Sequence, residues 1–184
     1  MENKIIYTAT TKTGKTVSFR YPTINDIEIL MNYINKISAE KSYITFQGEQ
    51  KTLEEEKKWL EEKLDLVSKN ECVFITAFIK NKLIASSEIT LESLIKNHVG
   101  SFGITVAKEC RGEGIGKILM DLVIKESIKN IKKLKIITLE CFGTNTIGLN
   151  LYKKLAFKEY GCLPNGLKRR GKFDDAILMY KKIK

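Results

Sequence analysis

The most constraining feature of this 184-residue chain is a strand that runs into a glycine-rich loop and then into a long helix. Residues 98–106 have the pattern of a strand, residues 111–116 read Arg-Gly-Glu-Gly-Ile-Gly, and apolar residues recur at helical spacing from Ile115 to about residue 131. Glycine tolerates positive φ and lets a ligand approach the backbone. The first N–H groups of a helix have no partners within it and, together with the helix dipole, favour an anion. The segment therefore predicts a binding site for a phosphorylated ligand.

The elements around this loop predict an α+β protein. Their order is one strand, two helices, three strands, a helix, a strand, a helix and two strands. The predicted strands are 17–21, 72–79, 83–91, 98–106, 136–141, 157–162 and 176–181, and the predicted helices begin near Thr23, Thr52, Ile115 and Thr146. The three consecutive strands form an antiparallel meander, whereas residues 98–141 form a β-α-β unit suited to a parallel pair. We expect a central mixed, mostly antiparallel sheet flanked by about four helices, in a single domain over residues 1–184 with its core at about 16–181.

The charge of the chain is concentrated in its second half. Residues 1–92 hold 13 Lys and Arg against 14 Asp and Glu, whereas residues 93–184 hold 19 against 8. A basic half indicates an anionic partner. Base readout and bidentate phosphate clamping favour arginine, and the chain has only Arg20, Arg111, Arg169 and Arg170. A phosphorylated cofactor is therefore favoured over nucleic acid as the partner.

No apolar run approaches the roughly 20 residues of a membrane-spanning helix. The N-terminal residues also lack the long apolar stretch of a secretory signal, so we expect a cytoplasmic protein without a membrane partner. There the four cysteines are expected to be reduced thiols. No CxxC pair is present and His98 is the only histidine, so we expect no metal site.

Two familiar nucleotide-binding motifs do not fit the glycine loop. A P-loop reads Gly-x-x-x-x-Gly-Lys-Ser/Thr, but Arg111 stands at its first glycine and Ile118 at its hydroxyl residue. The dinucleotide fingerprint reads Gly-x-Gly-x-x-Gly, and its third glycine would fall on Lys117 or Leu119. Both interpretations are therefore rejected.

A third interpretation fits two separate segments. Residues 111–116 resemble the Arg/Gln-x-x-Gly-x-Gly/Ala signature of the GNAT N-acetyltransferase superfamily. Residues 145–157 resemble its second signature, Asn-x-x-Ala-x-x-Leu-Tyr-x-Lys-Leu-Gly-Phe, with Gly148 for the usual alanine and Ala156 for the usual glycine. Residues 171–180 resemble the last strand of the family. The order of elements matches over about residues 16–181, which implies the GNAT-like acyl-CoA N-acyltransferase fold.

The resemblance implies an N-acetyltransferase that uses acetyl-CoA as cosubstrate and a primary amine, of a small molecule or a protein N-terminus, as acceptor. Direct attack in a ternary complex is implied. The backbone of Ile104 and Val106 would bind pantetheine, and the Val106 N–H would polarise the thioester carbonyl. Tyr152 would be the general acid that protonates the departing thiolate. The other implied cofactor contacts are Arg111, Gly112, Gly114, Ile115, Gly116, Lys117, Asn145 and Asn150.

The sequence offers several candidates for the general base that accepts the proton of the amine, whereas Tyr152 is the one candidate for the general acid. Glu88 is a candidate on strand 83–91, on the face opposite Leu83 and Ala85, and a solvated strand residue is the alternative. Glu40 is a further candidate to face the acceptor, His98 reads as a surface residue, and water can also carry the proton.

The identity of the acceptor is expected to depend on two loops, at residues 36–52 and 163–172. Two other function classes stay open. One is a non-catalytic CoA-binding regulatory module, against which the intact Tyr152 argues. The other is an RNA- or ribosome-associated basic protein, against which the lack of an arginine cluster with interleaved aromatics argues. A homodimer is compatible with the sequence.

Overall fold

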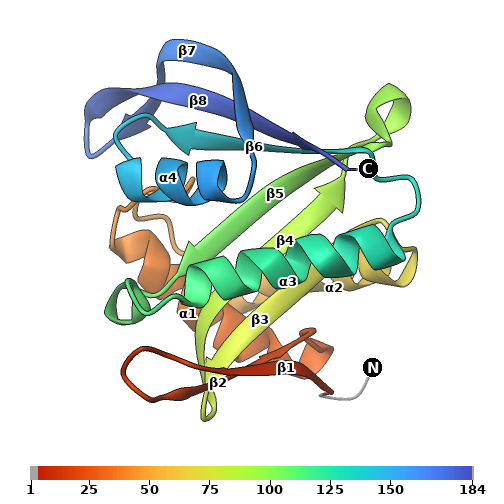
Figure 1. Ribbon diagram of the computed structural model, residues 1–184. Helices are drawn as coiled ribbons and strands as arrows, with labels where there is room; N and C mark the ends of the chain where they lie inside the picture. The colour runs from red at the N-terminus through yellow and green to blue at the C-terminus, as the bar shows by residue number, and fades with distance from the viewer. Residues whose placement is uncertain (1–3, 184) are drawn as a thin grey trace.

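A single eight-stranded sheet with helices on both faces organises the protein (Figure 1). The computed structural model describes residues 4–183. The strands are β1 (Ile5–Thr10), β2 (Thr16–Arg20), β3 (Cys72–Ile79), β4 (Lys82–Leu91), β5 (Val99–Val106), β6 (Ile136–Phe142), β7 (Lys158–Arg169) and β8 (Lys172–Lys182), in the order β1-β2-β3-β4-β5-β6-β8-β7. The helices are α1 (Ile27–Ala39), α2 (Leu53–Ser68), α3 (Ile115–Asn130) and α4 (Thr146–Lys154). Every pair of neighbours is antiparallel except β5 and β6. The predicted α+β class with a mixed, mostly antiparallel sheet is confirmed.

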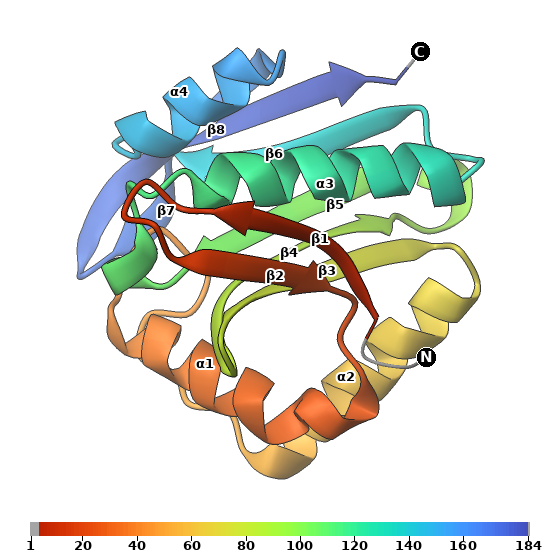
Figure 2. The same cartoon turned by 60° about the horizontal axis from the view of Figure 1, so that its bottom comes forward.

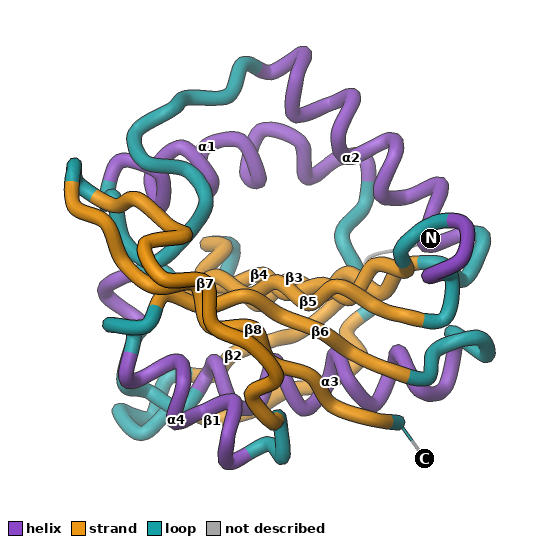
Figure 3. Tube along the Cα trace, turned by 90° about the horizontal axis from the view of Figure 1, so that it is seen from above, coloured by secondary structure: helices purple, strands orange, loops and turns teal. Residues whose placement is uncertain are grey.

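The sheet separates two helical layers, with α1 and α2 on one face and α3 and α4 on the other (Figure 3). Beneath α3 and α4 lies a large apolar cluster that includes Phe19, Ile75, Ile89 and Met179. A second cluster lies beneath α1 and α2. It contains Leu30, Tyr33, Ile37, Leu60, Cys72, Phe74, Phe78, Leu83 and Ala107. A ligand that lies between two strands of this sheet is therefore reached from two different layers.

The helices that cover the second cluster begin at side-chain caps. Thr52 and Glu55 form a capping box in which each side chain accepts from the backbone N–H of the other. Thr23 and Asp26 also form one, but it caps a single 3₁₀ turn, and α1 begins only at Ile27. The cap at Thr23 was therefore predicted correctly, whereas the regular helix starts four residues later.

The structure contains one strand that the sequence did not predict and one segment that was predicted wrongly. Strand β1 lies at the edge of the sheet with most of its side chains exposed, so it lacks the apolar run that marks a buried strand. Residues 163–169 were expected in a loop but belong to β7, which pairs with β8 up to a turn at Arg170 and Gly171. The register of this hairpin shifts between Leu163 and Leu167, around a proline that has no N–H to donate.

A bulge in β4 changes which side chains share a face with Glu88. Ala77 lies opposite Ala85, but the next residue of β3 lies opposite Leu83, so Ile84 is one extra residue on β4. Because side chains alternate along a strand, the extra residue brings Leu83 to the α1–α2 face, where Glu88 also lies. The expectation that Glu88 faces away from Leu83 is therefore wrong, although Glu88 does lie opposite Ala85 and Ile89.

Gly100 allows close packing where the parallel pair of strands begins. A Cβ atom at this position would lie 2.6 Å from Ile89 Cγ2 and 2.8 Å from Leu134 Cδ1. We predict that Gly100→Ala lowers the free energy of unfolding by about 1–3 kcal/mol, because the core must shift to accept the methyl group. Gly103→Ala is the matched control in the same strand, since its Cβ would meet only Glu88 Cγ at 3.9 Å. Denaturant unfolding of both variants tests this, and equal losses would contradict it.

Candidate active site

The site is built around an opening between β5 and β6. These strands pair in parallel only at Val99–Ile136, Gly100–Ile137 and Ser101–Thr138. Beyond these pairs β5 continues to Val106 and β6 to Phe142, and Figure 1 shows them diverging toward the start of α3. The last five residues of β5 therefore have no ladder partner on the β6 side within residues 4–183.

The backbone of Ile104 and Val106 faces this opening. Ala107 N–H donates to Ile84 O at 2.8 Å, toward β4. Backbone polar groups alternate between the two sides of a strand, so Thr105 also faces β4, whereas Ile104 and Val106 face the opposite side. The two residues predicted to bind pantetheine through their backbone are therefore the two whose N–H groups point into the opening.

The glycine loop lies at one end of the opening and leads directly into the N-terminus of α3. Gly112 has a φ of +80° and Gly114 a φ of +86°, a conformation that favours glycine. Gly114 directly precedes α3, whose first residue, Ile115, is buried. A Cβ atom at Gly116 would lie 3.7 Å from Val106 Cγ2 and 3.8 Å from Leu151 Cδ2, so the first turn of α3 lies between β5 and α4. Lys117 is exposed on the same turn.

Arg111 and Glu40 form an ion pair at the mouth of the opening. The Arg111 guanidinium donates to Val106 O at 2.9 Å and to Glu40 Oε2 at 2.5 Å. Glu40 caps the C-terminal end of α1 and its other oxygen lies 3.4 Å from Lys108 N. The structure thus places Glu40 against Arg111, where its carboxylate balances the charge of the guanidinium and ties the loop to α1.

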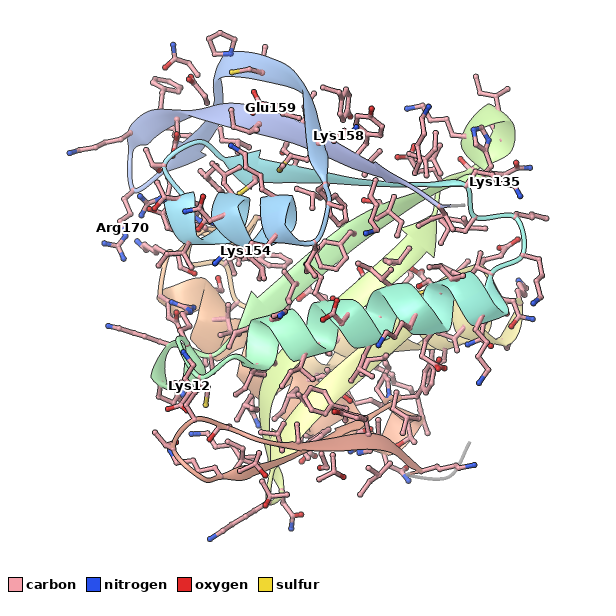
Figure 4. All side chains as sticks on the ribbon, in the orientation of Figure 1. Lys12, Lys135, Lys154, Lys158, Glu159 and Arg170 are labelled. Carbon is pink, nitrogen blue, oxygen red and sulfur yellow. The ribbon has the colours of Figure 1, made fainter. Side chains whose placement is uncertain are left out.

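The turn between β1 and β2 also contacts the glycine loop. Thr13 donates through its backbone N–H and its hydroxyl to Glu113 Oε2, at 3.2 and 3.1 Å. Figure 2 shows the β1–β2 hairpin alongside α3, and Figure 4 labels Lys12 in its turn. The β1–β2 turn and the end of α1, both distant in sequence, therefore contact the loop.

Figure 4 also labels Lys154, Lys158 and Arg170, basic residues of the α4–β7–β8 region.

Tyr152 approaches from the face covered by α3 and α4. Its ring packs edge-on against Phe102 of β5, with the centroids 6.2 Å apart, and it is 9% exposed. Burial, with a smaller effect from Cys141, raises the pKa of the Tyr152 phenol above its ordinary value. The phenol is therefore protonated at neutral pH, as a proton donor must be.

A pocket of about 270 Å³ approaches from the opposite face, between α1, α2 and the sheet. Its walls include the aromatic side chains of Tyr33, Phe46, Trp59 and Phe74. It reaches β5 at Gly103–Thr105, so it meets the strand along the unpaired stretch. Tyr33 Oη and Ser86 Oγ each lie 2.9 Å from Thr105 Oγ1, which makes a chain of hydroxyls in its wall. These three hydroxyls could not be predicted together from the sequence, because they come from three separate elements.

Two carboxylates line the pocket. Glu88 is paired with Lys63 of α2, whose Nζ lies 2.8 Å from Oε2 and 3.0 Å from Oε1. Glu56 of α2 is only 5% exposed, and burial raises the pKa of its carboxyl group, although Lys51 acts in the other direction. Sequence analysis missed Glu56. Its position four residues before Leu60, on the apolar side of the helix, was the available signal.

Comparison with known proteins decides the family. The model of the acetyltransferase (GNAT) family matches residues 37–157, well over half of the chain. The chain belongs to the GNAT acetyltransferase family. No curated protein matches it.

Solved structures share the GNAT fold over nearly the whole chain. An acetyltransferase of the GNAT family from Streptococcus pneumoniae is 24% identical, with a TM-score of 0.83 over 91% of this chain and 99% of that one. A putative acetyltransferase from Salmonella typhimurium, yncA, solved with acetyl-CoA, is 14% identical, with a TM-score of 0.80 over 91% and 94%. A ribosomal-protein-alanine N-acetyltransferase from Brucella melitensis is 20% identical, with a TM-score of 0.78 over 90% and 99%.

The departures from the second GNAT signature have local explanations. Asn145 caps α4, and its Oδ1 accepts from Gly148 N at 3.0 Å. A Cβ atom at Gly148 would lie 2.6 Å from Asn145 Nδ2, so glycine gives this cap room. Ala156 follows α4 with a φ of +64°, a position where glycine is usual.

Asn150 is exposed on α4. Exposed His98 lies outside the pocket lining.

No helix within residues 4–183 is long and apolar enough to span a membrane. The same residues contain no group of three or more His, Cys, Asp or Glu side chains arranged to bind a metal ion.

We predict that Arg111→Ala lowers affinity for CoA by about tenfold to a hundredfold, through loss of one charge-assisted contact to the pyrophosphate. Glu40→Gln is the matched control, because it leaves Arg111 in place and removes only its counter-charge, so affinity should not fall. Calorimetric titration with CoA and with a pantetheine fragment lacking the pyrophosphate measures both. If Arg111→Ala weakens both ligands equally, Arg111 shapes the loop and does not bind phosphate.

Proposed function

We propose that this protein is an acetyl-CoA-dependent N-acetyltransferase that acetylates a primary amine of a small molecule or a protein N-terminus in a ternary complex. The observation that carries the proposal is the convergence of four features on the β5–β6 opening. The start of α3 offers an anion site at its end, and the backbone of Ile104 and Val106 lines it. The pocket reaches it from one face, and on the other face the ring of Tyr152 packs against Phe102 of β5.

The residues at the opening fit coenzyme A. Gly112 and Gly114 have open space where a Cβ atom would stand, which suits close approach by a pyrophosphate. Ile104 and Val106 present backbone groups in the pattern of an edge strand, which suits the amides of pantetheine. Family membership and a structural neighbour solved with acetyl-CoA support this ligand.

When bound, acetyl-CoA would supply an acetyl thioester, and each nearby residue then has a distinct task. Val106 N–H would donate to the thioester oxygen as negative charge develops there. The amine nitrogen forms a bond to the acetyl carbon as the carbon–sulfur bond breaks. Tyr152 would give its proton to the departing sulfur, and the proton released by the amine balances the reaction. Glu88, or water in the pocket, would take that proton, so the products are an N-acetyl amide and the free CoA thiol.

A direct assay tests the activity. Protein, acetyl-CoA and a panel of primary amines should release free thiol together with a stoichiometric amount of N-acetylated amine. CoA binding without thiol release for any amine or N-terminal peptide would contradict the proposed activity and indicate a CoA-binding module.

We predict that Tyr152→Phe lowers the turnover number with little change in acetyl-CoA affinity, because only the proton donor is lost. The ring packing against Phe102 is kept, so the thermal unfolding midpoint should change little. Thiol release under saturating acetyl-CoA and calorimetric titration measure the two quantities. An unchanged turnover number would mean that water or another group protonates the thiolate.

A further inference from the structure

The pocket between α1, α2 and the sheet contains a buried carboxylate that the reaction above does not use. Glu56 is 5% exposed and lines the pocket. No hydrogen bond or ion pair among residues 4–183 includes its side chain, and only burial and the more distant charge of Lys51 perturb it. Burying an unpaired carboxylate is costly, so such a group indicates a missing cationic partner. From this geometry we propose that the acceptor is a short-chain diamine, with one amine at the β5–β6 opening and the second held as ammonium by Glu56.

Glu56 is the carboxylate in the pocket that is free to bind a ligand. Glu88 is already paired with Lys63, which also donates to Thr90 Oγ1 at 3.1 Å. The other charged group of the lining, Lys51, has its Nζ 5.6 Å from the centroid of the Phe46 ring. Glu56 is therefore the carboxylate of the lining that has no ion-pair partner among residues 4–183, although the charge of Lys51 also acts on it.

The charged amine at Glu56 differs from the amine that reacts. A nucleophilic amine must be uncharged when it attacks, whereas a buried carboxylate stabilises the protonated form. Glu56 projects from α2, and the pocket extends from there to Gly103–Thr105 of β5. A ligand that spans the pocket can thus leave one amine protonated at α2 and present the other to β5.

The size and walls of the pocket favour a short chain between the two amines. Its volume of about 270 Å³ lies just below the range of about 300–1,000 Å³ typical of sites for drug-sized ligands. The walls of the pocket are largely apolar, with Leu30, Ile34 and Phe74 among them. Methylene groups bury well against such walls.

Trp59 gives this inference, which rests on the proposed function, a readout that needs no activity. It is the only tryptophan of the chain and it lines the pocket, so its fluorescence reports occupancy. Three probes share a five-carbon chain with an amine at one end and differ at the other end: 1,5-diaminopentane, pentylamine and 5-aminopentanoate. We expect the kcat/KM for acetyl transfer to the diamine to exceed that for pentylamine by about tenfold to a hundredfold, because only the diamine can keep one ammonium at Glu56 while its other amine reacts.

Glu56→Gln should weaken binding of the diamine, read from Trp59 fluorescence, and should lower the kcat/KM for the diamine to that for pentylamine. Glu54→Gln is the matched control, because Glu54 is exposed in the same turn of α2 and should leave all three affinities unchanged. Thermal unfolding checks that Glu56→Gln is folded, and the probe series on the wild-type protein needs no variant.

Three results would overturn the inference: an equal kcat/KM of the wild-type protein for pentylamine and the diamine, tightest binding of 5-aminopentanoate, or an equal loss in Glu54→Gln. The second would assign specificity to Lys51. Titration with CoA and the thiol-release assay separate this inference from the proposed function. A protein that binds the diamine at Glu56 but transfers no acetyl group refutes only the function. A protein that acetylates pentylamine as well as the diamine refutes only the inference.

Discussion

The pairing of β5 with β6 stops after three residues, and the rest of the site depends on that interruption. Backbone N–H and C=O groups inside a sheet are normally paired, because leaving them unpaired and buried costs free energy. Here the parallel ladder ends at Ser101 and Thr138, while β5 continues to Val106. Beyond the ladder, the first turn of α3 packs against Val106 of β5 and Leu151 of α4. A ligand with its own amides can complete the unpaired edge.

The sheet gives the opening two chemically different sides. On the α1–α2 side lie a pocket with two carboxylates and the hydroxyls of Tyr33, Thr105 and Ser86. On the α3–α4 side, Tyr152 is packed among aromatic rings and keeps its proton. Under the proposed function, the acceptor would reach the opening from the pocket side and Tyr152 would lie on the other side of the sheet. The bulge at Ile84 contributes to this arrangement, because it sets which side chains of β4 share the pocket face with Glu88.

Local signals predicted the parts of the site that are local in sequence. The glycine loop, the caps at Thr52 and Asn145 and the β-α-β unit each depend on residues that are neighbours along the chain, and the structure contains all of them. The pairing of Arg111 with Glu40, 71 residues apart, could not be predicted in this way. The same holds for the pocket, whose walls come from α1, α2 and three strands. The bulge in β4 made the prediction for the face of Glu88 relative to Leu83 wrong, because strict alternation does not hold across a bulge. The Lys, Arg and Gly residues of 163–172 favoured a loop, although residues 163–169 belong to a strand.

Amide hydrogen exchange at Ile104 and Val106, with and without CoA, tests the central claim most directly. Both amides should exchange rapidly in the free protein relative to Thr105, whose backbone faces β4 in the antiparallel ladder. Saturating CoA should slow exchange at Ile104 and Val106 by pairing their N–H groups and leave Thr105 nearly unchanged. Slow exchange at all three amides in the free protein, or no change at Ile104 and Val106 on binding CoA, would contradict the claim that this interrupted ladder is the ligand site.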